Sequence, residues 1–288
     1  MSKYAEYKRY TRSRAGNVAY FAFLFLMGAF SVLPLVYCVC TAFKPLDELL
    51  VFPPRFFVHR PTVENFTELP SLLEKLQVPL SRYLFNSVFI AVVTTVLHIF
   101  AASMAAYAFS KSKIKGLGIF FLVVQFSLLY NGTTLSIPQY LIFSQLHIIN
   151  TFWVYILPAI PSSMGAFLMK QYMDSGIPDS LLEAAKIDGA GVFRIYWRIV
   201  MPITKPAWMT LLLFAFQGIW QTGPSAGTIF SEELKTLPYV MSSIAAGGTA
   251  RAGSAMAATV ILMIPPILVY FITQSNVMET MSSAGMKD

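Results

Sequence analysis

Polar and aromatic side chains inside apolar segments are the residues of this sequence best suited to handle a solute. Thr210, Phe214, Gln217 and Gln221 follow one another in steps of four, three and four residues, so they share one helix face. Amides donate and accept hydrogen bonds, and aromatic rings offer apolar faces, so this set suits a neutral polyhydroxylated solute. Hydrogen bonds between packed helices explain each residue equally well. The other candidates are Gln125, Tyr130 and Asn131.

Groups that would perform catalysis or bind a metal are scarce. The sequence has three histidines, and only His98 lies in a long apolar run, where we expect it to hydrogen-bond to a threonine or a backbone carbonyl. Cys38 and Cys40 are two residues apart on an expected helix, which favours neither a disulfide nor a zinc site. No GxxxxGK[ST] loop for phosphate binding occurs. We therefore expect neither an enzyme nor a bound cofactor or metal.

The composition indicates an integral membrane protein. Hydrophobic residues make up 56% of the 288 residues and charged residues 12%, with a mean hydropathy of +0.61. Soluble domains carry roughly 25% charged residues. The net charge of +7 does not indicate nucleic-acid binding, because most basic residues lie beside apolar segments.

The spacing of charges predicts an all-α membrane protein with six transmembrane helices. The runs between charges are long enough for one span each, except the run from Gly116 to Met169, which polar and breaker residues divide. A short interfacial segment is expected at 138–149, and Pro265-Pro266 should bend the last span rather than end it. None of the six spans contains Asp or Glu, which disfavours an ion-driven pump. The predicted spans are 17–40, 84–109, 117–135, 151–171, 206–222 and 254–275.

The basic residues also predict the orientation. The tail 1–16 holds five basic residues and one acid, and the loop 110–116 holds three lysines and no acid. With six spans, these two regions and the segment 172–205 fall on one side of the membrane. The positive-inside rule places that side, and both termini including the tail 276–288, in the cytoplasm.

The stretch "EAAKIDGAGVFRIYWRIVMP" at 183–202 is polar and interrupts the apolar pattern. Pro178 and Asp179 favour a helix start, so a helix is expected over 178–187, followed by a turn at Asp188-Gly189. A second helix begins near Ala190, with Val192, Tyr196, Ile199 and Val200 forming an amphipathic face. The pattern predicts a helical hairpin at the cytoplasmic surface. It leaves open whether this hairpin binds another protein or only lies at the interface.

Several motifs resemble the permeases of ABC importers of the carbohydrate-uptake type, related to the smaller permease of the maltose importer. Glu183, Ala184, Ala185 and Gly189, followed by "RIVMP", resemble the "EAA" loop of that family. The stretch 86–111, the segment 137–161, the "IPPILVYF" run at 264–271 and the ending "SAGMKD" look similar as well. The resemblance extends over about residues 17 to 288.

The resemblance implies a set of partners in a bacterial cytoplasmic (inner) membrane. A second, similar permease would complete the path for a carbohydrate, and an extracytoplasmic solute-binding protein would deliver it. Two ATPase subunits, which carry ATP and Mg²⁺, would dock on the loop 172–205, with 178–187 as the coupling helix. The implied ATPase-docking residues are Glu183, Ala184, Ala185, Asp188, Gly189 and Ala190. The implied binding-protein contacts, in the loop 223–253, are Leu237, Tyr239, Gly247, Gly248 and Arg251.

Three alternatives remain open at this stage. The solute could belong to another class, such as glycerol phosphate or a polyamine. The chain could be a membrane scaffold that binds a cytoplasmic partner without transport. The loop 223–253, rich in glycine and small residues, could be a solvated connector rather than a docking surface.

Overall fold

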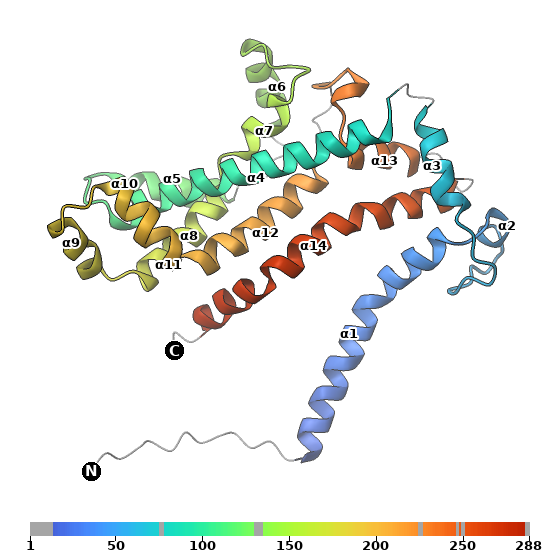
Figure 1. Ribbon diagram of the computed structural model, residues 1–288, viewed down its shortest axis with the longest axis horizontal. Helices are drawn as coiled ribbons and strands as arrows, with labels where there is room; N and C mark the ends of the chain where they lie inside the picture. Colours follow the sequence, from blue (N-terminus) through green and yellow to red (C-terminus); the bar gives the residue numbers. More distant parts are fainter. Residues whose placement is uncertain are drawn as a thin grey trace.

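The computed structural model describes residues 14–74, 78–129, 135–223, 227–245, 248 and 251–285. Within these residues all regular structure is helical and no strand occurs. The helices form an elongated bundle (Figure 1). The all-α fold class expected from the uncharged runs is therefore confirmed for the described part of the chain.

Three described helices are long and apolar enough to cross a membrane. They are α1 (Arg14–Ala42), α4 (Leu80–Lys111) and α14 (Ala252–Gly285). They coincide with the predicted spans 17–40, 84–109 and 254–275. As expected, α14 does not end at Pro265 and Pro266.

The other predicted spans are shorter or interrupted. The predicted span 117–135 begins with α5 (Leu117–Ser127), and its later part includes residues outside the described ranges. The predicted span 151–171 is divided into α7 (Trp153–Ala159) and α8 (Ser163–Gly176). The division follows from Pro161, which cannot donate a helical hydrogen bond, and from Ser162, whose hydroxyl caps α8 by accepting from Gly165 N (2.8 Å).

The predicted span 206–222 corresponds to α12 (Lys205–Gln221). The helical segment 192–203 meets α12 at an angle of 79°. Pro206 lies in the first turn of α12, where its missing N–H costs nothing. The predicted interfacial segment 138–149 largely coincides with α6 (Ser136–Gln145).

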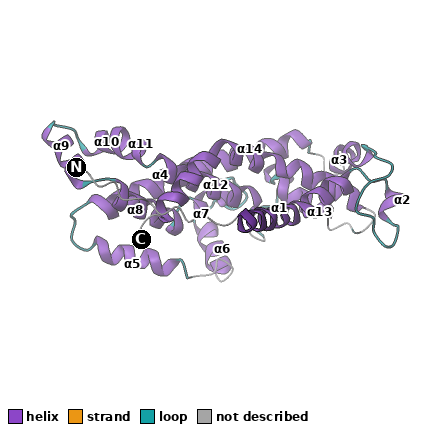
Figure 2. Cartoon of the chain, turned by 90° about the horizontal axis from the view of Figure 1, so that it is seen from below, coloured by secondary structure: helices purple, strands orange, loops and turns teal. Residues whose placement is uncertain are grey.

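Short helices gather at the two ends of the bundle (Figures 1 and 2). One end carries α9 (Asp179–Ile187), α10 (Val192–Ile195), the π-helix η2 (Tyr196–Val200) and α11 (Met201–Ile203). The opposite end carries α2 (Leu46–Leu49), α3 (Glu64–Glu74) and α13 (Leu237–Ala245), the last preceded by the 3-10 turn η3 (Glu232–Leu234).

Helix α4 lies at the centre of the packing. It contacts α5, α7, α8, α12 and α13, and small residues let α8 approach closely. A Cβ atom on Gly165 of α8 would lie 3.1 Å from the Cβ of Ala102 and 2.6 Å from the Oγ of Ser162. Ala102 and Ala106 are buried in this contact region, as their small-xxx-small spacing with neighbouring alanines predicts.

Helix α1 stands away from the rest of the bundle. It contacts α14 near one end, and its most apolar stretch is exposed over its whole length (Figure 1). Three buried clusters hold the described helices together. One joins α4, α8 and α12 to the helices that follow α8, and a second joins α3, α13, α14 and the end of α1 to the start of α4. A third, smaller cluster joins α4 to α12.

Candidate functional site

The predicted hairpin exists and occupies one end of the bundle; we define it as residues 178–200. Pro178 precedes α9 with an extended backbone (φ −64°, ψ 138°), and its ring fixes that φ. Asp179 follows in the first turn, where a negative charge is favourable to the helix dipole. Lys186 lies in the last turn, where a positive charge is favourable. The local sequence therefore specifies both ends of α9.

The turn after α9 is a Schellman motif. The backbone N–H of Ala190 donates to Ala185 O (2.9 Å), and the N–H of Gly189 donates to Lys186 O (3.0 Å). This pairing requires a left-handed backbone at the first residue after the C-cap Asp188, and that residue, Gly189, has φ +77°. The spacing from Ala185 to Gly189 and Ala190 is thus the spacing of a helix cap.

The second arm of the hairpin is packed more tightly than its sequence pattern predicted. Ile195, Tyr196 and Val200 are buried, and the hydroxyl of Tyr196 lies 2.6 Å from Ser103 Oγ of α4. Val192 is 61% exposed, so its predicted place on the buried face is wrong. The π-helix shifts the register between Val192 and Val200, which a constant helical period does not anticipate.

The six predicted docking residues lie together on the hairpin, and most of them face outward. Glu183, Ala184, Asp188 and Gly189 are exposed, while Ala185 and Ala190 are half-buried against the chain's own core. The side chain of Glu183 is 63% exposed, and its carboxylate lies 3.8 Å from Lys113 Nζ.

An exposed apolar group on the same hairpin was not predicted. Ile187 is 86% exposed, Phe193 67% and Trp197 53%. The sequence carried a signal for Ile187 and Phe193, because a helical period places them roughly opposite the buried Leu182 and Ile195. It carried none for Trp197, whose ring lies 5.3 Å from that of Tyr196. Large exposed apolar side chains on a polar segment often mark a surface that binds another protein.

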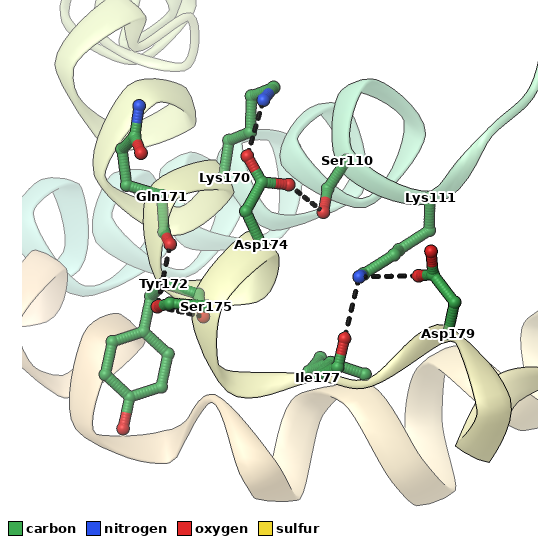
Figure 3. A network of polar contacts seen from close by, with 9 residues as sticks. All are labelled: Ser110, Lys111, Lys170, Gln171, Tyr172, Asp174, Ser175, Ile177 and Asp179. Carbon is green, nitrogen blue, oxygen red and sulfur yellow. Dashed lines mark hydrogen bonds and ion pairs between the residues drawn. The ribbon is translucent and has the colours of Figure 1, made fainter.

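A polar network connects the start of the hairpin to α4 and α8 (Figure 3). Lys111 Nζ, on the last residue of α4, donates to Ile177 O (2.7 Å) and to Asp179 Oδ1 (2.8 Å). Ser110 Oγ donates to Asp174 Oδ1 (2.5 Å), and Lys170 Nζ donates to Asp174 Oδ2 (2.6 Å). The hydrogen bond from Lys111 and its positive charge hold the pKa of Asp179 below its ordinary value. Lys170 and Asp174 are four residues apart on one helix, but the sequence gives no local signal for the bonds from α4, which span up to 68 positions.

The predicted solute-path residues do not share one environment. Thr210 is buried and donates to Pro206 O of its own helix (2.9 Å) and to Thr280 Oγ1 of α14 (3.1 Å), which is the helix-packing role. Phe214 and Gln221 are exposed, and Gln217 is half-buried. Gln125 is half-buried on α5. Tyr130 and Asn131 lie outside the described residues.

A cavity of ≈ 270 Å³ opens beside Gln221, between α1, α12, α13 and α14. Its lining includes Leu35, Trp220 and Pro266. The indole N–H of Trp220 donates to Leu262 O (3.0 Å), which leaves the Gln221 amide as the free polar group of the lining. His98, as predicted, bonds to a carbonyl: its Nδ1 lies 2.7 Å from Ala159 O. Among the described residues no group of His, Cys, Asp and Glu is arranged to bind a metal.

Residues 227–245, which we call the strap, lie at the other end of the bundle and are firmly bonded to it. Asn150, with φ +61°, accepts from the N–H groups of Phe230 and Ser231 (3.0 Å each) and donates to Ser231 Oγ (2.8 Å). The amide of Asn86 donates to Glu233 O (2.7 Å) and Lys235 O (3.0 Å).

The predicted binding-protein contacts have different exposures. Leu237 is 1% exposed and belongs to the core cluster of α13, so its side chain is not on the surface. Tyr239 is half-buried, and Lys235 Nζ lies 5.2 Å from the centre of its ring. Gly248, with φ +84°, and Arg251 are exposed. Gly247 lies outside the described residues.

Comparisons with known proteins agree with this architecture. The profile of the family described as "Binding-protein-dependent transport system inner membrane component" matches residues 9–282. The polygalacturonan/rhamnogalacturonan transport system permease protein YtcP of Bacillus subtilis is 27% identical, over 92% of this chain and 96% of YtcP. The arabinooligosaccharides transport system permease protein AraQ of B. subtilis is 26% identical, over 94% and 96%. A chain in the crystal structure of a bacterial ABC transporter involved in the import of the acidic polysaccharide alginate shares the fold, with a TM-score of 0.74, 22% identity and coverage of 92% and 98%.

Proposed function

The chain belongs to the family of binding-protein-dependent transport system inner membrane components, and we propose that it is a permease subunit of an ATP-driven importer of oligosaccharides. The names of YtcP and AraQ support the carbohydrate class, because both relatives match nearly the whole chain. The half-buried and exposed amides on α12 are chemically compatible with sugar hydroxyls.

In this proposal the chain crosses a bacterial inner membrane six times, with both termini in the cytoplasm. Three described helices have the length and apolarity of a span. The three further spans would comprise α5 with the residues after it, α7 with α8, and α12. The concentration of basic residues in 1–16, 110–116 and 172–205 supports the orientation.

The hairpin would dock on an ATPase subunit, which binds ATP and Mg²⁺ and supplies the energy. The observation that carries this proposal is the capped turn at Gly189, which presents Glu183, Ala184 and Ile187 on an exposed tip. Closure of two ATPase subunits would move this hairpin and that of a second permease, and so alternate the access of the path between the two sides.

The strap end would face the extracytoplasmic solute-binding protein. Tyr239, Gly248 and Arg251 remain the surface candidates for that contact, since Leu237 is buried. A second, similar permease would complete the solute path, and the exposed face of α1 is available to it or to lipid.

Affinity purification of this chain from its own membranes tests the proposal. We expect an ATPase subunit and a second permease to co-purify, as identified by mass spectrometry. The solute-binding protein that co-purifies with this complex should be stabilised in a thermal-shift screen by oligosaccharides from arabinan, pectin or alginate. Recovery of the chain without an ATPase, or stabilisation of the binding protein only by glycerol phosphate or a polyamine, contradicts the corresponding part.

A further inference from the structure

Helix α4 differs from the other two long apolar helices in having neither proline nor glycine. Its 32 residues, Leu80–Lys111, form one uninterrupted helix, which corresponds to a length of about 48 Å. In contrast, α1 contains Pro34, and α14 contains Pro265 and Pro266. Proline and glycine are the usual sites of helix kinks. Helix α4 is therefore the long element best able to move as one rigid body.

The hairpin end of α4 is bonded to the point where α8 passes into α9. The side chain of Lys111 is 8% exposed, and its ammonium group bonds both to the carbonyl of Ile177, which ends α8, and to the carboxylate of Asp179, which begins α9 (Figure 3). A buried ammonium group is costly unless it is paired in this way. A displacement of α9 must therefore move Lys111 or break both bonds.

A second contact joins the other arm of the hairpin to the same helix. Ser103 lies two turns before Lys111 on α4, and its hydroxyl is 2.6 Å from the hydroxyl of Tyr196 in a buried position. The first and second arms of the hairpin are thus both attached to α4. The hairpin and this end of α4 must therefore move together unless these bonds break.

The opposite end of α4 is bonded to the strap. Asn86 is fully buried, and its amide donates to the carbonyls of Glu233 and Lys235, on both sides of Leu234. On the next residue, Ser87 Oγ accepts from the N–H of Leu237 (2.7 Å). All three bonds go to backbone atoms of the strap. They therefore fix the position of the strap relative to α4 independently of the contacts that the strap side chains make.

We propose that α4 moves as one rigid body and so transmits displacement between the ATPase-docking hairpin and the strap. Lys111 and Asn86 are the positioning residues at its two ends. This inference rests on the proposed function. It assigns a role in energy coupling to two residues that contact neither the ATPase tip nor the solute path.

The test uses the complete complex, with its second permease, ATPase subunits and binding protein, in proteoliposomes supplied with pooled arabinan, pectin and alginate hydrolysates. For Lys111→Met we expect about a tenfold fall in sugar imported per ATP hydrolysed, within the range of measured coupling between sites. For Asn86→Leu we expect a similar fall in the stimulation of ATP hydrolysis by the loaded binding protein. Lys115→Met is the matched control, because it removes an exposed lysine four residues further on.

Asp179→Asn provides a variant that does not endanger folding, since the Asp179 side chain is 77% exposed. It should reproduce part of the Lys111→Met defect, and the double variant should be no worse than Lys111→Met alone, because both act on one bond. Lys111→Arg, which keeps the charge and the donors, should restore most of the coupling.

Two results overturn the inference. One is an unchanged ratio of sugar to ATP in Lys111→Met and unchanged stimulation in Asn86→Leu. The other is loss of the ATPase subunits from the Lys111→Met complex, which makes Lys111 an assembly residue. Failure of the proposed function looks different, because then the unmodified complex imports no oligosaccharide or contains no ATPase.

Discussion

The hairpin and the strap are both polar segments at the ends of the bundle, yet they are built in opposite ways. The strap buries the apolar residues of α13, Leu237, Val240, Met241 and Ile244, leaves Phe230 64% exposed, and is bonded along its length by α4 and by Asn150. The hairpin is bonded to the bundle mainly near its two ends. Its large exposed apolar residues are Leu181, Ile187, Val192, Phe193 and Trp197.

This difference separates two ways of fixing a segment. The strap takes its position from contacts within the chain, so its conformation is complete without a partner. The tip of the hairpin has an intrinsically specified shape, through the cap at Gly189, but its apolar surface is uncovered. Such a surface is typical of a segment whose remaining contacts come from another protein.

The largest expected effect is a difference in the free energy of unfolding between two variants, each of which removes an apolar side chain, one from the strap and one from the hairpin. Leu237→Ala should lower the free energy of unfolding by about 2–5 kcal/mol, because it leaves a cavity in a buried cluster. Ile187→Ala should leave it nearly unchanged, because that side chain is 86% exposed. Thermal unfolding of the detergent-solubilised chain measures both.

The same two variants separate stability from docking. Ile187→Ala should reduce the amount of ATPase subunit that co-purifies, whereas Leu237→Ala should reduce the yield of folded chain at an unchanged ATPase ratio. Equal destabilisation by both substitutions would mean that the hairpin tip is packed within the chain. The hairpin and the strap would then not differ in how they are positioned.

A smaller effect is expected at the turn of the hairpin. Gly189→Val forces a β-branched residue into φ +77°, at a strain on the order of 1–3 kcal/mol that reshapes the tip. Gly191→Val is the matched control, since Gly191 has φ −68° and open space around its Cβ position. Substrate uptake should fall strongly in the first variant and little in the second, with both chains inserted in the membrane. Similar uptake in the two variants would show that the left-handed turn is not required.

Local features of the structure were predictable from the sequence. The helices α1, α4 and α14 follow from long uncharged runs, and the ends of α9 follow from Pro178, Asp179 and Gly189. Each of these signals acts within one or two helical turns. The breaks beside Ser162 and between α11 and α12 were less predictable, because proline fixes where a helix is interrupted but not the angle that follows.

Features that depend on distant contacts were not predictable. The sequence marks Lys111 only as one basic residue among several, and its partners Ile177 and Asp179 are known only once α4 and α8 are packed. Leu237 was expected on the surface because the family resemblance implies that the loop 223–253 contacts a binding protein, but burial depends on what α13 packs against. The π-helix η2 and the exposure of Val192 were likewise not predictable from a constant helical period.

The smallest effect on thermal stability is expected at Glu183. Substitutions there test most directly whether the hairpin, unlike the strap, depends on contacts with a partner. The Glu183 carboxylate lies 3.8 Å from Lys113 Nζ, with both side chains exposed, and such pairs contribute about 0–1 kcal/mol. Lys113→Met and Glu183→Lys should therefore leave thermal unfolding nearly unchanged. Only Glu183→Lys should lower ATPase recovery and uptake, because an exposed carboxylate held within the chain only by this weak surface pair is available to a cation of the partner. If Lys113→Met lowers ATPase recovery as much as Glu183→Lys does, the carboxylate acts through its own chain, and the hairpin is positioned from within as the strap is.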